Sequence, residues 1–299
     1  MVFHSIKIKT NKIILIIGLL ILSLFFIFLI SFTKSNLNKK RLREAKISEQ
    51  KKIIAPYYEE KVFRNKKTKA IEGKIKIPII MYHYVEYVKN ISDFIRKRLD
   101  ISPSIFEKTL KALKEAQYDT YFVKEIPDIL DGKVDYSTKS AVLTFDDGYE
   151  DFYTVVFPLL KKYHSRATLF IIYDFIGRKG FLNEKEIKEV IDSGLVEIGS
   201  HTLDHLSLDY IPSNLAKKQI FESKSKLEEE FGITIKSFAY PYGTFNQQTV
   251  DFVKEASYSA AVSVISGTYQ SKDSLFFLSR IRSGLLGQDV IWSIDSLKN

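Results

Sequence analysis

Two carboxylates and two imidazoles are the residues whose types and spacing best fit a chemical role. Asp146 and Asp147 are adjacent, and His201 and His205 stand four residues apart. Adjacent carboxylates are costly unless a cation pairs with them. Histidines four residues apart share one face when the backbone makes a helical turn. On such a turn, we expect both imidazoles to reach one metal ion.

Each pattern also has a plainer explanation. Asp-Gly is common in turns, so Asp146 to Gly148 also fits a turn that caps a helix. A histidine pair at this spacing can arise by chance in a chain with five histidines. Together, however, two histidines and one carboxylate provide three ligands and leave positions open for water and substrate, as in catalytic metal sites. The second aspartate then remains free as a general base.

Alternating strand-like and helix-like segments must position these residues. The alternation from Ile75 onward predicts an α/β domain with a mainly parallel sheet, which can close into a barrel. In such folds, chemistry gathers at the carboxyl ends of strands, where His83, both aspartates, both histidines and Tyr240 to Gly243 fall. The predicted strands are 75–85, 140–145, 167–172, 195–198, 237–240, 260–264 and 277–281, and the predicted helices are 105–117, 151–163, 183–193, 213–231 and 247–256.

The first 73 residues differ in charge from the rest of the chain. They hold 16 Lys and Arg against 5 Asp and Glu, whereas residues 74–299 hold 29 against 31. The basic character therefore belongs to the amino-terminal segment, which argues against nucleic acid as a partner. The sequence has no cysteine, which excludes disulfides, Cys-based zinc sites and Cys nucleophiles.

A run of 20 uncharged residues, 13–32, is long enough as a helix to cross a bilayer. We expect a short tail (1–12), a transmembrane signal-anchor helix (13–32), a basic stalk (33–73) and one catalytic domain (74–299) outside the cytoplasm. A cleaved signal peptide usually has a shorter apolar run and a small-residue cleavage site. The first Ala after the run is Ala45, so we favour an uncleaved anchor in the cell membrane. The flanking lysines do not fix its orientation.

Three ordered motifs resemble those of polysaccharide deacetylases, the NodB-homology domains of carbohydrate esterase family four. They read TFDDG (144–148), HTLDH (201–205) and YPYG (240–243), and the resemblance covers about Ile77 to Arg282. It implies a distorted (β/α) barrel with fewer than eight complete repeats. It also implies site roles: Asp147, His201 and His205 as metal ligands, Asp146 as the general base that takes a proton from the attacking water, and the backbone N–H of Tyr242 as an oxyanion donor.

The chain departs from the family pattern in two places. Many members carry an Arg before the Pro of the third motif, and this Arg holds the base in place. This chain has no Arg there, and Arg280 or Arg282 could replace it. Many members also have a late Leu-x-His whose His is the general acid, but no His follows His205. Met81-Tyr82-His83 resembles a branch with rearranged motifs, the poly-β-1,6-N-acetylglucosamine N-deacetylases. We therefore expect His83 to protonate the leaving amine; a core His that caps a strand is the alternative.

The predicted function is metal-dependent removal of N-acetyl groups from an extracellular N-acetylglucosamine polysaccharide. Zinc is the favoured metal, although iron, cobalt, nickel and manganese also suit two histidines and a carboxylate. Alternative substrates are peptidoglycan and acetyl esters of other polysaccharides. A catalytically silent carbohydrate-binding or assembly protein is an alternative of another class. Five tyrosines near these residues could stack on sugar rings or belong to an aromatic core: Tyr82, Tyr84, Tyr149, Tyr240 and Tyr242.

Overall fold

A closed ring of parallel strands forms the centre of the computed structural model, which describes residues 73–88, 92–134, 136–137, 139–285, 291 and 294. The strand order is β2-β12-β10-β9-β8-β7-β6, and pairing of β2 with β6 closes the ring. The predicted barrel with fewer than eight repeats is therefore confirmed. The ring strands are β2 (Ile79–Tyr82), β6 (Ser140–Phe145), β7 (Ala167–Ile171), β8 (Val196–Ser200), β9 (Ser237–Ala239), β10 (Ala260–Ser266) and β12 (Leu278–Arg282).

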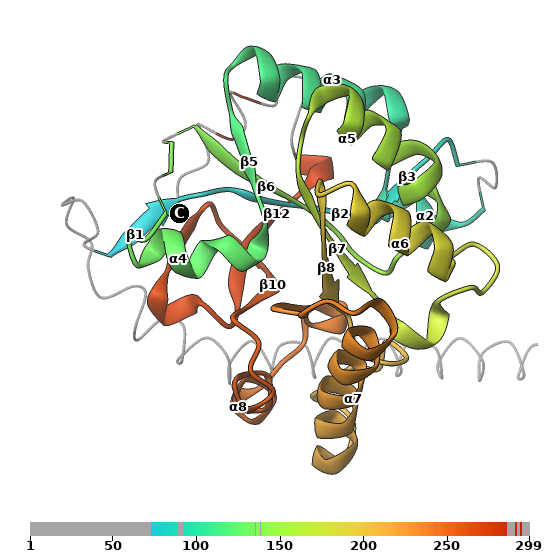
Figure 1. Cartoon of the computed structure of the whole chain (residues 1–299), viewed down its shortest axis with the longest axis vertical. Coiled ribbons are helices and arrows are strands. Elements are labelled where there is room, and N and C mark those ends of the chain that lie inside the picture. Colours follow the sequence, from blue (N-terminus) through green and yellow to red (C-terminus); the bar gives the residue numbers. More distant parts are fainter. Residues whose placement is uncertain are drawn as a thin grey trace, which may run out of the picture. The chain divides into compact units, whose positions relative to one another are not determined.

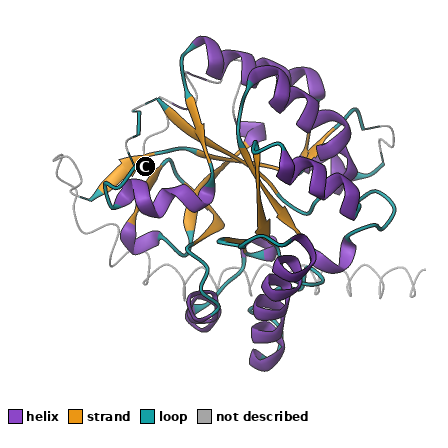
Figure 2. Cartoon of the chain, viewed as in Figure 1, coloured by secondary structure: helices purple, strands orange, loops and turns teal. Residues whose placement is uncertain are grey.

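Helices surround the strands (Figures 1 and 2). All five predicted helices are confirmed with small shifts at their ends. Asn183 begins one of them in a capping box with Glu186, and Gly232 ends another in the left-handed conformation. The helices are α3 (Pro103–Glu115), α5 (Phe157–Tyr163), α6 (Glu184–Asp192), α7 (Ser213–Phe231) and α8 (Gln247–Glu255), and a π-helical turn, Phe152–Val156, precedes α5.

The predicted single strand 75–85 is wrong in its extent. Pro78 has no N–H to donate to a strand ladder, and the segment divides around it. β1 (Lys74–Lys76) pairs outside the barrel with β11 (Tyr269–Ser271), and only β2 joins the ring. β3 (Tyr84–Val85) is the separate end of that predicted strand. Several short elements were not predicted: β4 (Asp100–Ile101), β5 (Asp119–Tyr121), β11, α2 (Phe94–Leu99), α4 (Ile126–Leu130), and the single turns Val123–Glu125, Tyr173–Phe175, Pro241–Gly243, Lys272–Ser274 and Ser283–Leu285.

Large and very small side chains fill the barrel together. The ring of Phe170 packs against Gly199 on the neighbouring strand, where a Cβ atom would lie 2.5 Å from that ring. Glycine is therefore required at position 199, because a side chain there would displace the aromatic ring. The other apolar residues packed with Phe170 are Ile77, Ile79, Tyr121, Val123, Ile126, Ile129, Val142, Ala239, Ala260, Val262 and Leu278.

Within the described part of the chain, no helix is both long and apolar enough to cross a bilayer. The predicted tail (1–12), membrane helix (13–32) and all of the predicted stalk except Gly73 lie outside the described residues.

Candidate metal centre and active site

Asp147, His201 and His205 meet at the carboxyl ends of β6 and β8. The Nε2 atoms of His201 and His205 each lie 3.3 Å from Oδ1 of Asp147, and one ligand atom from each residue lies within 4.8 Å of the others. Oδ1 of Asp147 is buried and accepts no hydrogen bond. A buried carboxylate oxygen without a partner is costly, and a cation would satisfy it. The donor set and its unpaired oxygen therefore fit a divalent metal.

The orientation of His201 supports this assignment. Nδ1 of His201 lies 2.8 Å from the carbonyl oxygen of Ala239, so Nδ1 donates and Nε2 faces Asp147. Burial opposes ionisation of both side chains, but their mutual attraction outweighs it, raising the pKa of His201 and lowering that of Asp147. Burial and the neighbouring charge of His201 lower the pKa of His205 to about 4. His201 therefore presents Nε2, and not Nδ1, toward the position that a metal would occupy.

The predicted helical turn across 201–205 is wrong. Thr202 and His205 have φ angles of 70° and 63°, in the left-handed region, and the segment is a loop. The loop follows directly from β8 and hydrogen-bonds to neighbouring elements: the N–H groups of Tyr173 and Asp174 donate to its carbonyls. These contacts, rather than helical periodicity, bring the two imidazole rings to 4.8 Å between centroids.

Asp146 is buried against Arg280 of β12. Two parallel hydrogen bonds of 2.8 Å join the guanidinium to the two carboxylate oxygens. Arg280 is itself only 2% exposed, and its Nε donates to the carbonyl of Ser263, whereas Arg282 is exposed. Burial opposes ionisation of Asp146, but the Arg280 charge and hydrogen bonds outweigh it and lower the pKa of the carboxyl group. Arg280, not Arg282, thus occupies the place expected of the third-motif arginine.

The φ angle of Asp147, 77°, explains how two consecutive carboxylates take different partners. Left-handed backbone is tolerated by aspartate and turns its side chain away from that of Asp146. As a result, Asp146 pairs with Arg280 while Asp147 faces the two histidines.

His83 lies between β2 and β3, beside Asp146. Its Nε2 is 3.8 Å from Oδ2 of Asp146, and its side chain is 18% exposed. Burial lowers the pKa of His83, and the charges of Asp146 and Asp147 oppose that shift. The structure therefore brings His83 to the site, within reach of both carboxylate and solvent, while its role as an acid stays a prediction.

Tyr242 is the exposed member of the five tyrosines singled out in the sequence. It is 65% exposed, and its ring centroid lies 4.5 Å from that of His205. Tyr82, Tyr84 and Tyr240 are core residues, and Tyr149 is half-buried. The turn that carries Tyr242 is fixed by Gly243, where a Cβ atom would lie 2.2 Å from the Val264 side chain.

One buried carboxyl near the site had no signal in the sequence. Asp151 accepts a hydrogen bond from the backbone N–H of Val85, in the strand that follows His83, while its Oδ1 is buried without a partner. Burial raises the pKa of Asp151 to about 6. Asp151 therefore helps to fix the position of β3.

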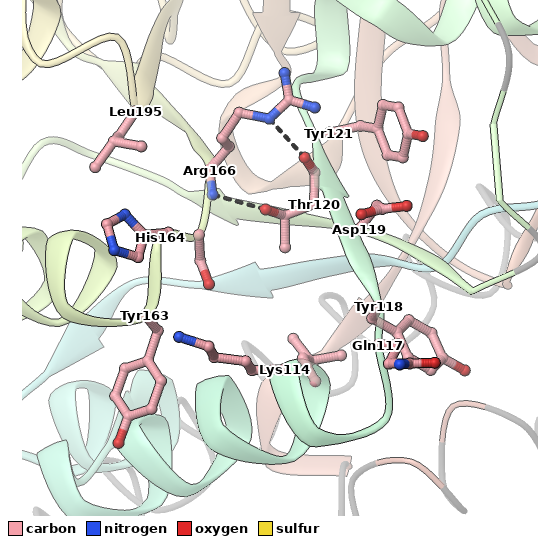
Figure 3. Close-up of a pocket in the computed structure, with 12 residues that line it drawn as sticks. Lys114, Gln117, Tyr118, Asp119, Thr120, Tyr121, Tyr163, His164, Arg166 and Leu195 are labelled. Carbon is pink, nitrogen blue, oxygen red and sulfur yellow. Dashed lines mark hydrogen bonds between the residues drawn. The ribbon is translucent and has the colours of Figure 1, made fainter.

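A cavity of about 570 Å³ lies at the opposite end of the barrel, where β5, β7 and β8 begin. Figure 3 shows Arg166 at its wall, donating hydrogen bonds from its backbone and side chain to Thr120. None of the predicted site residues lines this cavity. The chemistry expected from the sequence therefore belongs to the carboxyl end of the barrel.

Comparison with known proteins agrees with this geometry. A sequence profile of the polysaccharide deacetylase family matches residues 133–261. The chain is 31% identical to the Bacillus subtilis protein YxkH, whose name assigns it to the polysaccharide deacetylases, over 76% of this chain and 79% of that protein. The chain belongs to the polysaccharide deacetylase family. This deacetylase is also 29% identical to a Staphylococcus aureus poly-beta-1,6-N-acetyl-D-glucosamine N-deacetylase, over 67% of this chain and 76% of that protein.

A solved structure extends the likeness to the fold. The Streptococcus pyogenes deacetylase PplD, determined in complex with acetate, superimposes with a TM-score of 0.65 and 29% identity. The match covers 70% of this deacetylase and 92% of PplD. The cluster of Asp147, His201 and His205 therefore lies in a fold that this deacetylase shares with PplD.

Proposed function

We propose that this polysaccharide deacetylase removes N-acetyl groups from a β-1,6-linked N-acetylglucosamine polymer in a metal-dependent reaction. The observation that carries the proposal is the position of His83, 3.8 Å from Asp146 in a chain with no histidine after His205. An early histidine in the site is the feature by which the sequence resembles the poly-β-1,6-N-acetylglucosamine branch. The similarity to the Staphylococcus aureus enzyme supports the same substrate class.

Each site residue has a defined task in this proposal. Asp147, His201 and His205 would hold the metal, zinc being favoured. When bound, the metal supplies a Lewis acid that polarises the amide carbonyl and acidifies a water molecule. Asp146 accepts the proton of the attacking water: it stays ionised, and its two hydrogen bonds with Arg280 leave carboxylate lone pairs free.

His83 and Tyr242 complete the reaction. Asp146 passes the proton that it took from water to the neighbouring His83, and His83 delivers that proton to the amine nitrogen as the C–N bond breaks. The backbone N–H of Tyr242 stabilises the oxyanion, and its exposed ring offers a face on which a sugar can stack. In this proposal Arg280 and His83 take the places of the third-motif arginine and the late histidine that the chain lacks.

We also propose that the catalytic domain works outside the cytoplasm, attached to the membrane by residues 13–32. The support is the uncharged 20-residue run in the sequence and the extracellular location of such polymers.

The substrate proposal is tested by acetate release from matched oligomers. Purified full-length protein, loaded with zinc, is offered β-1,6-linked and β-1,4-linked N-acetylglucosamine oligomers of equal length, peptidoglycan glycan, and an acetylated xylan. We expect the β-1,6-linked oligomer to give the highest kcat/KM, with activity lost on chelation and restored by metal. Faster release from peptidoglycan or from the ester would overturn the substrate class, and release that is indifferent to chelator would overturn metal dependence.

A further inference from the structure

The loop that carries both histidine ligands, 201–205, has an unfavourable backbone. Thr202 and His205 both have positive φ angles, and Thr202 is β-branched and fully buried. Such residues are unfavourable and persist only where their surroundings hold them. Contacts from outside the loop must therefore keep the two imidazoles in place.

Four of the five N–H groups of this loop donate hydrogen bonds that help to hold it. The N–H of His201 donates to Ile171 on β7, and the N–H of His205 donates to the Thr202 hydroxyl at 3.1 Å. The N–H groups of Leu203 and Asp204 both donate to the side-chain Oε1 of Gln219, at 3.0 and 3.3 Å. One side chain thus satisfies two of the three N–H groups that lie between the histidines.

Gln219 is built into the interior of α7. It is 2% exposed, so its amide has little freedom to move. Two N–H donors converge on one atom, which fixes that atom as the carbonyl oxygen because the amide nitrogen cannot accept. Four residues later on α7, the Ser223 hydroxyl bonds to that of Ser200, which directly precedes His201. The helix is thereby held against the strand end from which the loop emerges.

We propose that Gln219 is a positioning residue of the metal site, acting on His201 and His205 through the loop backbone. Without its acceptor, two buried N–H groups lose their partner, and the loop relieves this by leaving its left-handed conformations. The two Nε2 atoms then no longer face the same oxygen of Asp147. This inference rests on the proposed metal dependence.

Zinc affinity of the full-length protein tests the role directly. Gln219→Met keeps the size of the side chain and removes the acceptor, whereas Gln219→Glu keeps an acceptor oxygen. The control, Leu227→Val, alters a buried residue two turns further along the same helix. Zinc binding is measured by calorimetry on metal-stripped protein, and thermal unfolding is measured in chelator.

We expect Gln219→Met to raise the zinc dissociation constant about 10- to 100-fold, as loss of a group that orients metal ligands typically does. Gln219→Glu should recover most of this loss, and Leu227→Val should lower Tm without changing zinc affinity. If Gln219→Met fails to fold, Gln219→Asn, whose shorter amide cannot reach the loop, replaces it with the same expectation.

Two outcomes overturn the inference and are distinguishable. If Gln219→Met lowers Tm but binds zinc as the wild type does, the residue is structural only, and the proposed function stands. If the wild-type protein binds none of zinc, iron, cobalt, nickel or manganese, the proposed metal dependence and the role of Gln219 fall together.

Discussion

Arg280 forms two parallel hydrogen bonds to Asp146, which lies 134 residues earlier in the sequence. Both side chains are buried, so each charge depends on the other for compensation. The pair fixes the direction of the proposed base and keeps it ionised.

Two substitutions of Arg280 separate the effect of its positive charge from the effect of its two hydrogen bonds to Asp146. Arg280→Lys keeps a positive charge but cannot make both hydrogen bonds, so we expect kcat for acetate release to fall at least about ten-fold. Arg280→Ala leaves a buried carboxylate unpaired and should also destabilise the fold by roughly 3–5 kcal/mol. Steady-state kinetics and denaturant unfolding measure the two effects. Arg282→Lys, at an exposed position two residues along the same strand, is the control; an equal loss there would contradict the assignment.

Substitutions of the adjacent residues Asp146 and Asp147 should have different effects on zinc content and acetate release. Asp146→Asn removes the proposed base, so we expect acetate release to fall by about 10²–10⁴ while zinc stays bound. Asp147→Asn removes a ligand and should lose both zinc and activity. Zinc content after dialysis and acetate release are measured on the same samples. Near-normal turnover by Asp146→Asn would refute the mechanism.

His83 should act on turnover rather than on metal or substrate binding. His83→Gln keeps a polar side chain but cannot shuttle a proton, so we expect kcat to fall by about 10²-fold with KM little changed. Zinc content should match that of the wild type, because His83 lies outside the ligand set. Replacing His164, an exposed histidine at the far end of the barrel, should have no effect. A rise in KM alone would assign His83 to substrate binding instead.

Asp151 should make stability depend on pH. Burial raises its folded-state pKa from 3.8 to about 6, so the folded protein binds this proton more tightly than the unfolded chain. The stabilising contribution is therefore complete below about pH 4 and is lost as pH rises through about 6, with a size on the order of 2–3 kcal/mol. Asp151→Asn, which never ionises, should flatten the profile of Tm against pH over this window. Parallel profiles for the two proteins would contradict the assignment.

The sequence predicted most of the fold because its strong signals were local. The five helices and most ring strands follow from periodicity and from caps such as Asn183. Short elements were not predicted, because β4 and β5 are too brief to carry a periodic pattern. Pro78 divides a run that the sequence pattern predicts as one strand.

The site was predictable in its residues but not in its geometry. His201 and His205 are four residues apart on a loop, so the spacing picked out two side chains that the fold brings together, although loop contacts and not a helical turn do so. Arg280 and Arg282 lie two residues apart and so share one face of β12. They differ in depth, because Arg280 is buried inside the barrel and Arg282 is exposed at the end of the strand, and no motif in the sequence reveals that depth. Gln219 accepts from a backbone N–H of the loop, and the backbone carbonyl of Ala239 accepts from His201. Contacts of this kind depend on the fold, so the residue types in the sequence do not reveal them.

The place of β12 in the ring also bears on the order in which the molecule matures. β12 sits between β10 and β2 and is the last ring strand to be synthesised. Until it inserts, the ring is open and Asp146 has no guanidinium beside it. A chain that ends before Arg280 therefore lacks both a closed barrel and a positive charge beside Asp146. The proposed active site can form only after β12 is in place.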